Sequence, residues 1–410
     1  MPKSYPQFEP LLVQLRRHFR EERYSHGTVW NYPVAVRRFL SALERRGQAV
    51  ESVTPADVER HLDSLRLKRR RGSFPDHSRR MHRAAIRMLL RLVHGRWPPE
   101  LVPTKAHEIA EREIVIGYDT WMRDLRGLSP STRRHGRAEA YRLLRWLREH
   151  GKAVSSVSVV DLDAYVRERG AGQRRTSIAL MVYTLRGVLR YLHGSGRMPV
   201  DLAPEISGPP IYALEGIPST IRVEDVQRVL KATRRDRSPL GRRDYAILML
   251  LATYGLRGGE IMALRLSDID WRHERLHIRH SKTGAHSALP LLRRPADALL
   301  DYLKYGRPET KAREVFIRAC APYRALTAHA ALHLLLTRRL AAIGVSLTGK
   351  RGAHVLRHSR AVSLLRGGAS LKVIGDVLGH RSEQSTSPYL KLATEDLRSV
   401  ALDLPAGVSP

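Results

Sequence analysis

Apolar residues recur every three or four positions along most of this 410-residue chain, which is the spacing of amphipathic helices. Two stretches with this pattern also resemble each other: SHGTVWNYPVAVRRFLSALERRGQAVESVTPADV, which begins at Ser25, and SPSTRRHGRAEAYRLLRWLREHGKAVSSVSVVDL, which begins at Ser129. Thr28 matches Thr132 at an offset of 104 positions (132 − 28), and several Leu, Gly, Val and Asp residues match at the same offset. The pattern therefore predicts two copies of one small helical bundle.

Each copy has recognisable helix starts and stops. The first helix of each begins at a Ser or Thr that can cap it, a second begins near Asp57 or Asp161, and a later one covers about 77–93 or 175–192. A proline-rich stretch, 198–218, predicts an extended linker. The expected organisation is a first helical repeat at 1–105, a second at 106–205, a linker at 206–218 and a C-terminal domain at 219–410.

The period of the pattern changes inside the C-terminal domain. After an apolar helix, DYAILMLLATYGL, the segments ERLHIRH and HSALPL alternate and flank SKTG, which predicts a β-hairpin with Lys282 at its tip. Further helices are expected at 295–304 and 329–343, and then two more on either side of Gly367, the last ending at Gly379. The predicted fold class is mainly α: two tandem helical bundles, then a mixed, mostly α domain with a small antiparallel sheet.

Charge narrows the choice of partner. Lys and Arg outnumber Asp and Glu by 72 to 40, a net charge of +32, which favours nucleic acid. The basic residues repeat without evident acidic neighbours, so they are interpreted as phosphate contacts on a duplex. The longest uncharged apolar run is twelve residues, 245–256, against the roughly 20 that span a membrane. The candidate DNA contacts are Arg37, Arg38, Lys68, Arg69, Arg70, Arg71, Arg133, Arg134, Arg137, Arg174 and Arg175.

Candidate chemistry is concentrated in the C-terminal domain. Arg257 follows the apolar helix and precedes Glu260 by three positions, a spacing that also suits a purely structural ion pair. His354 and Arg357 lie at i and i+3 of one helix, which places an imidazole and a cation on one face. His380 and Tyr389 follow within a polar segment.

These motifs, in this order and spacing, resemble the signature of the tyrosine recombinase (phage integrase-like) family. The resemblance implies SAM-like core-binding domains for the helical repeats and a 3′-phosphotyrosyl intermediate formed without cofactor or metal. It also implies a role for each site residue: Arg257 and Arg357 as phosphate ligands, Glu260 as a support for Arg257, Lys282 as general acid, His354 as general base, His380 as a phosphate donor and Tyr389 as nucleophile.

The same resemblance implies partners and a setting. A homotetramer on double-stranded DNA recombination sites is expected, with accessory recombinases or DNA-bending proteins as further candidates and no membrane association. The segment Leu392–Leu404 resembles a tail helix that passes to a neighbouring protomer or docks on its own domain. The lack of an apolar leader and the single cysteine, Cys320, predict a cytoplasmic protein, which is expected on the nucleoid. The doubled recognition domain suggests a recombinase of a mobile element.

Three other functions are compatible with parts of the sequence. The tandem helices around Gly367 resemble a helix-turn-helix, which would suit a non-catalytic DNA-binding regulator. A type IB topoisomerase would share the nucleophile and the arginines. A zinc enzyme could use His354 and His358, although the glutamate of the usual metalloprotease motif is missing.

Overall fold

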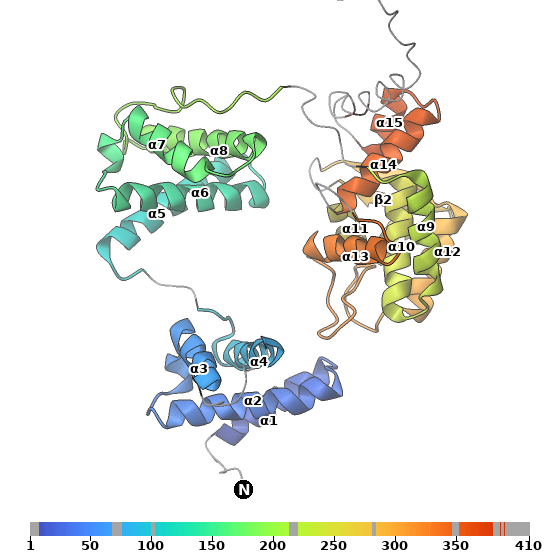
Figure 1. Ribbon diagram of the computed structural model, residues 1–410, viewed down its shortest axis with the longest axis horizontal. Coiled ribbons are helices and arrows are strands. Elements are labelled where there is room, and N and C mark those ends of the chain that lie inside the picture. The colour runs from blue at the N-terminus through green and yellow to red at the C-terminus, as the bar shows by residue number, and fades with distance from the viewer. Residues whose placement is uncertain are drawn as a thin grey trace, which may run out of the picture. The chain divides into compact units, whose positions relative to one another are not determined.

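The computed structural model describes residues 8–67, 76–99, 103–212, 220–280, 284–327, 329–346, 352–379, 386 and 389 (Figure 1). Helices make up most of the described residues, and the described strands form one antiparallel sheet. Glu100–Glu215 form one compact unit, and Met1–Pro99 with Gly216–Pro410 form another. Hydrophobic cores are found in residues 12–97, 115–206 and 221–356. The mainly α fold class is confirmed, whereas the predicted boundaries at 105, 205 and 218 stay predictions.

The first repeat is a bundle of helices around an aromatic core. Its elements are α1 (Glu9–Glu21), α2 (His26–Glu44), η2 (Val50–Ser52), α3 (Pro55–Leu67) and α4 (Asp76–His94). Ser25 caps α2, since its Oγ accepts a hydrogen bond from the backbone N–H of Thr28 at 3.4 Å. Phe19, Phe39 and Leu89 are fully buried. The predicted capping serine thus starts α2.

The second repeat has the same order of elements. They are α5 (Ala106–Asp124), α6 (Pro130–Glu149), η3 (Val154–Ser156), α7 (Val159–Gly170) and α8 (Arg175–Gly194). Ser129 caps α6 through the N–H of Thr132 at 3.3 Å, as Ser25 caps α2. Ser158 and Asp161 form a reciprocal capping box at the start of α7. The duplication predicted from sequence is therefore confirmed as two bundles of one design.

The segment that follows α8 differs from the extended linker expected from its prolines. Met198, Ala203 and Ile206 are buried in the core of the second repeat. Arg186 holds the segment down by donating two hydrogen bonds to the carbonyl oxygen of Ile206, at 3.1 and 2.5 Å. Residues 198–206 therefore pack on the second repeat instead of extending from it, because the apolar residues between the prolines can be buried.

The C-terminal domain is built around one apolar helix, α10. Its elements are α9 (Val223–Arg235), α10 (Pro239–Tyr254), α11 (Gly258–Ala263), η4 (Leu266–Asp268), β1 (Ile269–Asp270), β2 (Arg275–Arg279), β3 (His286–Pro290), α12 (Arg293–Tyr305), α13 (His329–Ala341), α14 (Ala353–Arg366) and α15 (Leu371–Leu378). Residues 246–251 of α10 are all buried, and α9, α12 and α14 pack around this helix. Its position explains why the helix lacks a polar face.

The predicted hairpin is confirmed, and one further strand joins it. β2 pairs with β3 in antiparallel register, with Leu276 opposite Leu289 and Ile278 opposite Ser287. β1 pairs with the other edge of β2, which gives the order β1-β2-β3. β1 contains two residues, which is too short for an alternating pattern to be visible in the sequence.

Candidate functional site

Arg257 owes its position to the way α10 ends. Gly255 caps α10 with a left-handed backbone (φ 65°), and a Cβ there would lie 2.6 Å from Leu378 Cδ2, so glycine is required. The chain then turns, and Arg257 becomes the N-cap residue of α11. Its Nη1 donates to Glu260 Oε1 at 2.8 Å, and its Nη2 donates to the carbonyl oxygen of Gly379 at 3.0 Å.

Arg357 approaches the same place from α14, and it is nearly fully buried. Its Nη1 donates to the carbonyl oxygen of Gly255 at 2.8 Å, and its Nη2 donates to that of Leu378 at 2.5 Å. Burial, together with the nearby positive charge of Arg257, lowers the pKa of Arg357 to about 10. The group therefore stays protonated at neutral pH, although its surroundings disfavour the charge.

The two guanidinium groups lie side by side at the end of α15. They donate to the carbonyl oxygens of consecutive residues, Leu378 and Gly379. Each guanidinium has five N–H donors, so both retain donors beyond the bonds described here. Two such groups held together by the backbone form a preorganised site for an anion with several oxygens.

Tyr389 is buried beside these cations. Its hydroxyl lies 2.8 Å from Nδ1 of His358, one helical turn beyond His354 on α14. Burial raises the pKa of Tyr389, and the charges of Arg357 and Arg257 oppose that rise. The nucleophile predicted from sequence therefore lies within the electrostatic influence of both predicted arginines.

The two histidines of α14 have different surroundings. His354, the predicted base, is exposed, and its ring centroid lies 6.3 Å from that of His358. His358 is partly buried and makes the hydrogen bond with Tyr389. The sequence placed both imidazoles on one helix face but did not assign His358 to the tyrosine.

His280 is a site residue that the sequence interpretation missed. It is buried at the end of β2, with Nδ1 2.8 Å from Glu260 Oε1 and Nε2 2.9 Å from Ser287 Oγ. Hydrogen bonds from His280 and Arg257 lower the pKa of Glu260, against the opposing effect of burial. A signal was present, since 276 and 278 are the inward positions of β2 and the next position in the same alternation, 280, is a histidine.

Family models match most of the chain. The phage integrase family model matches residues 219–396, and the model for the phage integrase N-terminal SAM-like domain matches twice, at 13–94 and 116–196. The Sinorhizobium fredii protein y4rA, named as an integrase/recombinase, is 34% identical over 324 residues, which are 78% of each chain. The tyrosine recombinase XerD of Proteus mirabilis is 31% identical over 66% of this chain and 86% of its own. The chain belongs to the phage integrase family of tyrosine recombinases.

Solved structures of low sequence identity share the fold of this recombinase. The XerH site-specific recombinase bound to a palindromic difH substrate has 16% identity and a TM-score of 0.56, over 74% of this chain and 98% of that one. A lambda integrase dimer bound to a COC′ core site has 18% identity and a TM-score of 0.53, over 68% and 94% of the two chains.

Several predicted residues of the recombinase lie outside the described residues. They are Lys282 and His380 of the site, the basic run Lys68, Arg69, Arg70 and Arg71, and the tail segment Leu392–Leu404. The roles predicted for them stay predictions.

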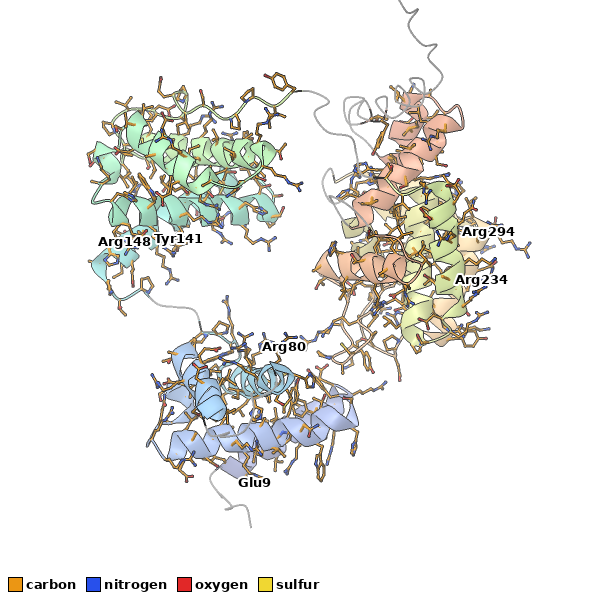
Figure 2. All side chains as sticks on the ribbon, viewed as in Figure 1. Glu9, Arg80, Tyr141, Arg148, Arg234 and Arg294 are labelled. Atoms are coloured by element: carbon orange, nitrogen blue, oxygen red, sulfur yellow. The ribbon has the colours of Figure 1, made fainter. Side chains whose placement is uncertain are left out.

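The basic faces of the helical repeats have more acidic neighbours than the sequence suggested. Arg37 lies 3.8 Å from Glu9, and Arg133 and Arg137 each lie 3.7 Å from Asp119. The expectation that they lack acidic partners was therefore wrong for these three, because the partner is on another helix. Arg148, which is labelled in Figure 2, likewise pairs with Glu111 at 3.0 Å. Arg38, Arg134, Arg174 and Arg175 are exposed.

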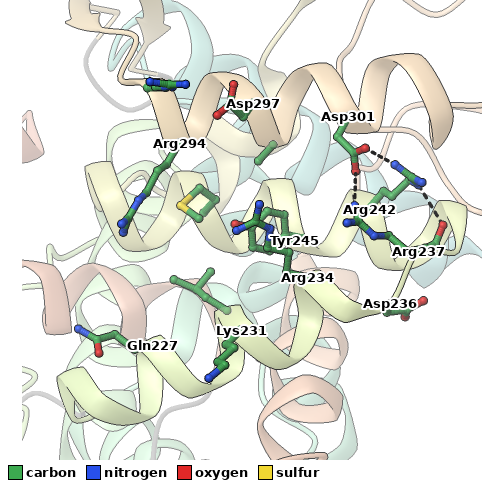
Figure 3. Close-up of a pocket in the computed structure, with 14 residues that line it drawn as sticks. Gln227, Lys231, Arg234, Asp236, Arg237, Arg242, Tyr245, Arg294, Asp297 and Asp301 are labelled. Carbon is green, nitrogen blue, oxygen red and sulfur yellow. Dashed lines mark hydrogen bonds and ion pairs between the residues drawn. The ribbon is translucent and has the colours of Figure 1, made fainter.

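The C-terminal domain also has a groove between α9, α10 and α12, separate from the residues described above (Figure 3). Its volume is about 1010 Å³. Exposed cations line it, among them Lys231, Arg234 and Arg294, while Arg242 and Arg237 pair with Asp301. Nothing in the structure shows what occupies this groove.

Two kinds of feature are absent from the described residues. None of the described helices has both the length and the apolar character needed to cross a bilayer. Among the described side chains, no three His, Cys, Asp or Glu residues are grouped so that they could hold a metal ion.

Proposed function

We propose that this protein is a site-specific DNA recombinase that cuts and rejoins DNA through a 3′-phosphotyrosyl intermediate. The observation that carries the proposal is the position of Tyr389, whose hydroxyl is hydrogen-bonded to His358 within the field of Arg257 and Arg357. A phenol, an imidazole and two guanidiniums close to one another are suited to attack on a phosphodiester. Relatives named as integrases and recombinases support the same function.

In the cleavage step, the Tyr389 oxygen forms a bond to phosphorus and the bond from phosphorus to the 5′ oxygen breaks. The two non-bridging oxygens gain charge in the transition state, and Arg257 and Arg357 donate hydrogen bonds to them. Forming a phenolate at pH 7 costs about 4 kcal/mol from a reference pKa of about 10. The arginines offset part of this cost, since both lower the pKa of Tyr389 against the effect of burial.

Two proton transfers complete the step. His358 accepts the phenolic proton, because its Nδ1 is already 2.8 Å from the hydroxyl oxygen, and His354 on the next turn is an alternative acceptor. Lys282 gives a proton to the departing 5′ oxygen, and His380 donates to the phosphate. The step reverses when a 5′-hydroxyl from another strand attacks the phosphotyrosine, so the bond energy is conserved and no ATP is needed.

The proposed substrate is a pair of double-stranded DNA recombination sites. The net charge of +32 favours duplex DNA, and the two helical repeats supply the basic surfaces that contact it. Exchange between two duplexes needs four active sites, so a homotetramer on DNA is proposed, acting in the cytoplasm on the nucleoid for a mobile element. Accessory recombinases or DNA-bending proteins are further candidate partners. A solved lambda integrase tetramer is bound to a Holliday junction, and it shares this fold with a TM-score of 0.52.

Covalent attachment to DNA tests the proposal directly. Nicked duplexes tiled from the DNA that flanks the gene are incubated in EDTA with wild type, Tyr389→Phe and the matched control Tyr305→Phe, which alters an exposed tyrosine. After denaturation, wild type and the control should be attached to a 3′ end on at least one duplex, and Tyr389→Phe should bind but not attach. Equal attachment by Tyr389→Phe would eliminate Tyr389 as the nucleophile.

A further inference from the structure

His280 lies where three site segments of the C-terminal domain meet. It directly follows β2, it contacts Glu260 of α11, and its ring packs on Gly379 after α15. The mechanism proposed above assigns it no role. Its contacts nevertheless connect it to the hairpin whose sequence includes the predicted general acid and, through Glu260, to Arg257.

The first connection runs to Arg257. A carboxylate can only accept, so Nδ1 of His280 donates to Oε1 of Glu260, the same oxygen that accepts from Arg257 Nη1. The second carboxylate oxygen of Glu260 accepts from the backbone N–H of Arg257 at 2.8 Å. Because Glu260 is buried and bonded on both sides, a displacement of the His280 ring is transmitted to the arginine.

The second connection runs to the hairpin. The backbone N–H of His280 donates to the carbonyl oxygen of Ala285 at 2.9 Å, and the N–H of Gly284 donates to that of His280 at 2.8 Å. Nε2 of His280 also bonds Ser287 on the returning strand at 2.9 Å. These contacts join the end of β2 to the start of β3, and Lys282 lies between the two in the sequence. His280 therefore fixes the base of the hairpin to the buried Glu260.

The third connection is a close contact with the end of α15. Gly379 has a left-handed backbone (φ 62°), and a Cβ built on it would lie 2.6 Å from Cε1 of His280. The glycine is therefore required for the ring to pack there, and the residue that follows is His380.

We propose that His280 is a positioning residue that fixes the Lys282 hairpin to the Arg257–Glu260 pair, so that the leaving 5′ oxygen receives its proton at the moment Tyr389 attacks. The inference rests on the proposed function and deepens it, because it assigns a role to a buried residue behind the predicted catalytic groups. The affected event is the transfer of a proton from the Lys282 ammonium to the 5′ oxygen as its bond to phosphorus breaks. Loss of His280 should have less effect on the attack by Tyr389 and on the neutralisation of the phosphate charge by the arginines.

The decisive experiment replaces the leaving atom. On a duplex to which wild type attaches, the bridging 5′ oxygen at the scissile phosphate is replaced by sulfur. A thiol has a pKa of about 8.5, so it departs as a thiolate without a general acid. His280→Leu should cleave the oxygen substrate about 10- to 100-fold more slowly than wild type, less than the roughly 10²–10⁴-fold of a whole general acid because Lys282 itself is still present, and should cleave the sulfur substrate within about twofold of wild type.

Matched variants separate positioning from folding. His277→Leu alters an exposed histidine on the same strand and should behave as wild type on both substrates. His280→Asn retains an N–H donor towards Glu260 and should recover part of the rate, whereas Ser287→Ala removes the outer hydrogen bond alone. Equal loss on the oxygen and sulfur substrates, or no loss on the oxygen substrate, would overturn the proposal.

A second measurement needs no DNA. Hydrogen–deuterium exchange of the full-length protein should show faster exchange at 275–290 in His280→Leu, with exchange in α12 unchanged. Unchanged exchange in the hairpin would refute the proposal even if no cleavable duplex had been found. If the proposed recombinase function is wrong, wild type itself will attach to no duplex. That result is distinct from the failure of the role proposed for His280.

Discussion

Arginine occurs in two contrasting surroundings in this recombinase: buried in the catalytic site and exposed on the helical repeats. Arg357 is 3% exposed and is held by the carbonyl oxygens of Gly255 and Leu378. Arg137, on α6, is exposed and lies 3.7 Å from the carboxylate of Asp119. Burying a charge costs several kcal/mol, and carbonyl dipoles do not neutralise it. The contrast indicates that the site keeps positive charge available for the phosphate. The charge of the surface arginines, by comparison, is partly neutralised by carboxylates.

The largest expected effect comes from removing the buried charge. Arg357→Met should slow single-turnover attachment to a nicked duplex by roughly 10²–10³-fold, since loss of one preorganised oxyanion donor costs about 2.7–4 kcal/mol. Arg357→Lys should recover little, because lysine cannot provide the planar fork of donors. Quenched-flow or gel assays of the covalent complex measure both.

Stability should change far less than catalysis in the same variant. Loss of the desolvated charge and loss of two hydrogen bonds to carbonyls act in opposite directions, so the free energy of unfolding should stay within about 2 kcal/mol of wild type in urea. Arg366→Met, which alters an exposed arginine on the same helix, is the matched control. Normal cleavage by Arg357→Met would show that the charge is not needed for catalysis. Unfolding of this variant would show that Arg357 is needed for stability, and either result would contradict the contrast.

Glu260→Gln should have an intermediate effect, and its pH dependence has a definite sign. The pKa of Glu260 is lowered in the folded protein, so its carboxylate stabilises the fold fully above the unfolded value of about 4.3. That advantage over the glutamine variant, about 1–3 kcal/mol at pH 7, should disappear as the pH falls through the lower folded pKa. Urea unfolding at pH 7, 5, 4 and 3 measures the difference, and a difference that is constant with pH would show that the ionised form is irrelevant.

Local signals in the sequence were enough to predict most of the fold. Ser25 and Ser129 cap the expected helices, the alternating segments form β2 and β3, and Gly379 ends α15 with a left-handed backbone. Such signals depend on a few neighbouring residues, so one sequence displays them. The constant offset between the two repeats was enough to predict the second bundle, although nothing was known of its packing.

Contacts between distant segments could not be predicted in the same way. The hydrogen bond between His358 and Tyr389 joins residues 31 positions apart, and the bond between His280 and Glu260 joins residues 20 apart. Asp119 neutralises Arg133 from a different helix, which charge counting along the chain does not show. Sequence spacing identifies which residues share a face, and tertiary packing decides which of them meet.

The smallest expected effect concerns the surface arginines. Arg134 and Arg145 are exposed on α6 and lie 11 positions apart, three helical turns on one face. The double variant Arg134→Ala/Arg145→Ala should reduce the slope of log binding constant against log salt by about 1 for each DNA phosphate that the protein no longer neutralises. Its attachment rate at saturating protein should equal that of wild type, because these arginines hold DNA without touching the reacting atoms.

Arg123→Ala, whose arginine is already bonded to Asp124 at 2.6 Å, is the matched control and should leave the slope unchanged. A slower chemical step in the double variant would mean that surface and site arginines act together, and the distinction drawn from their burial would then fail.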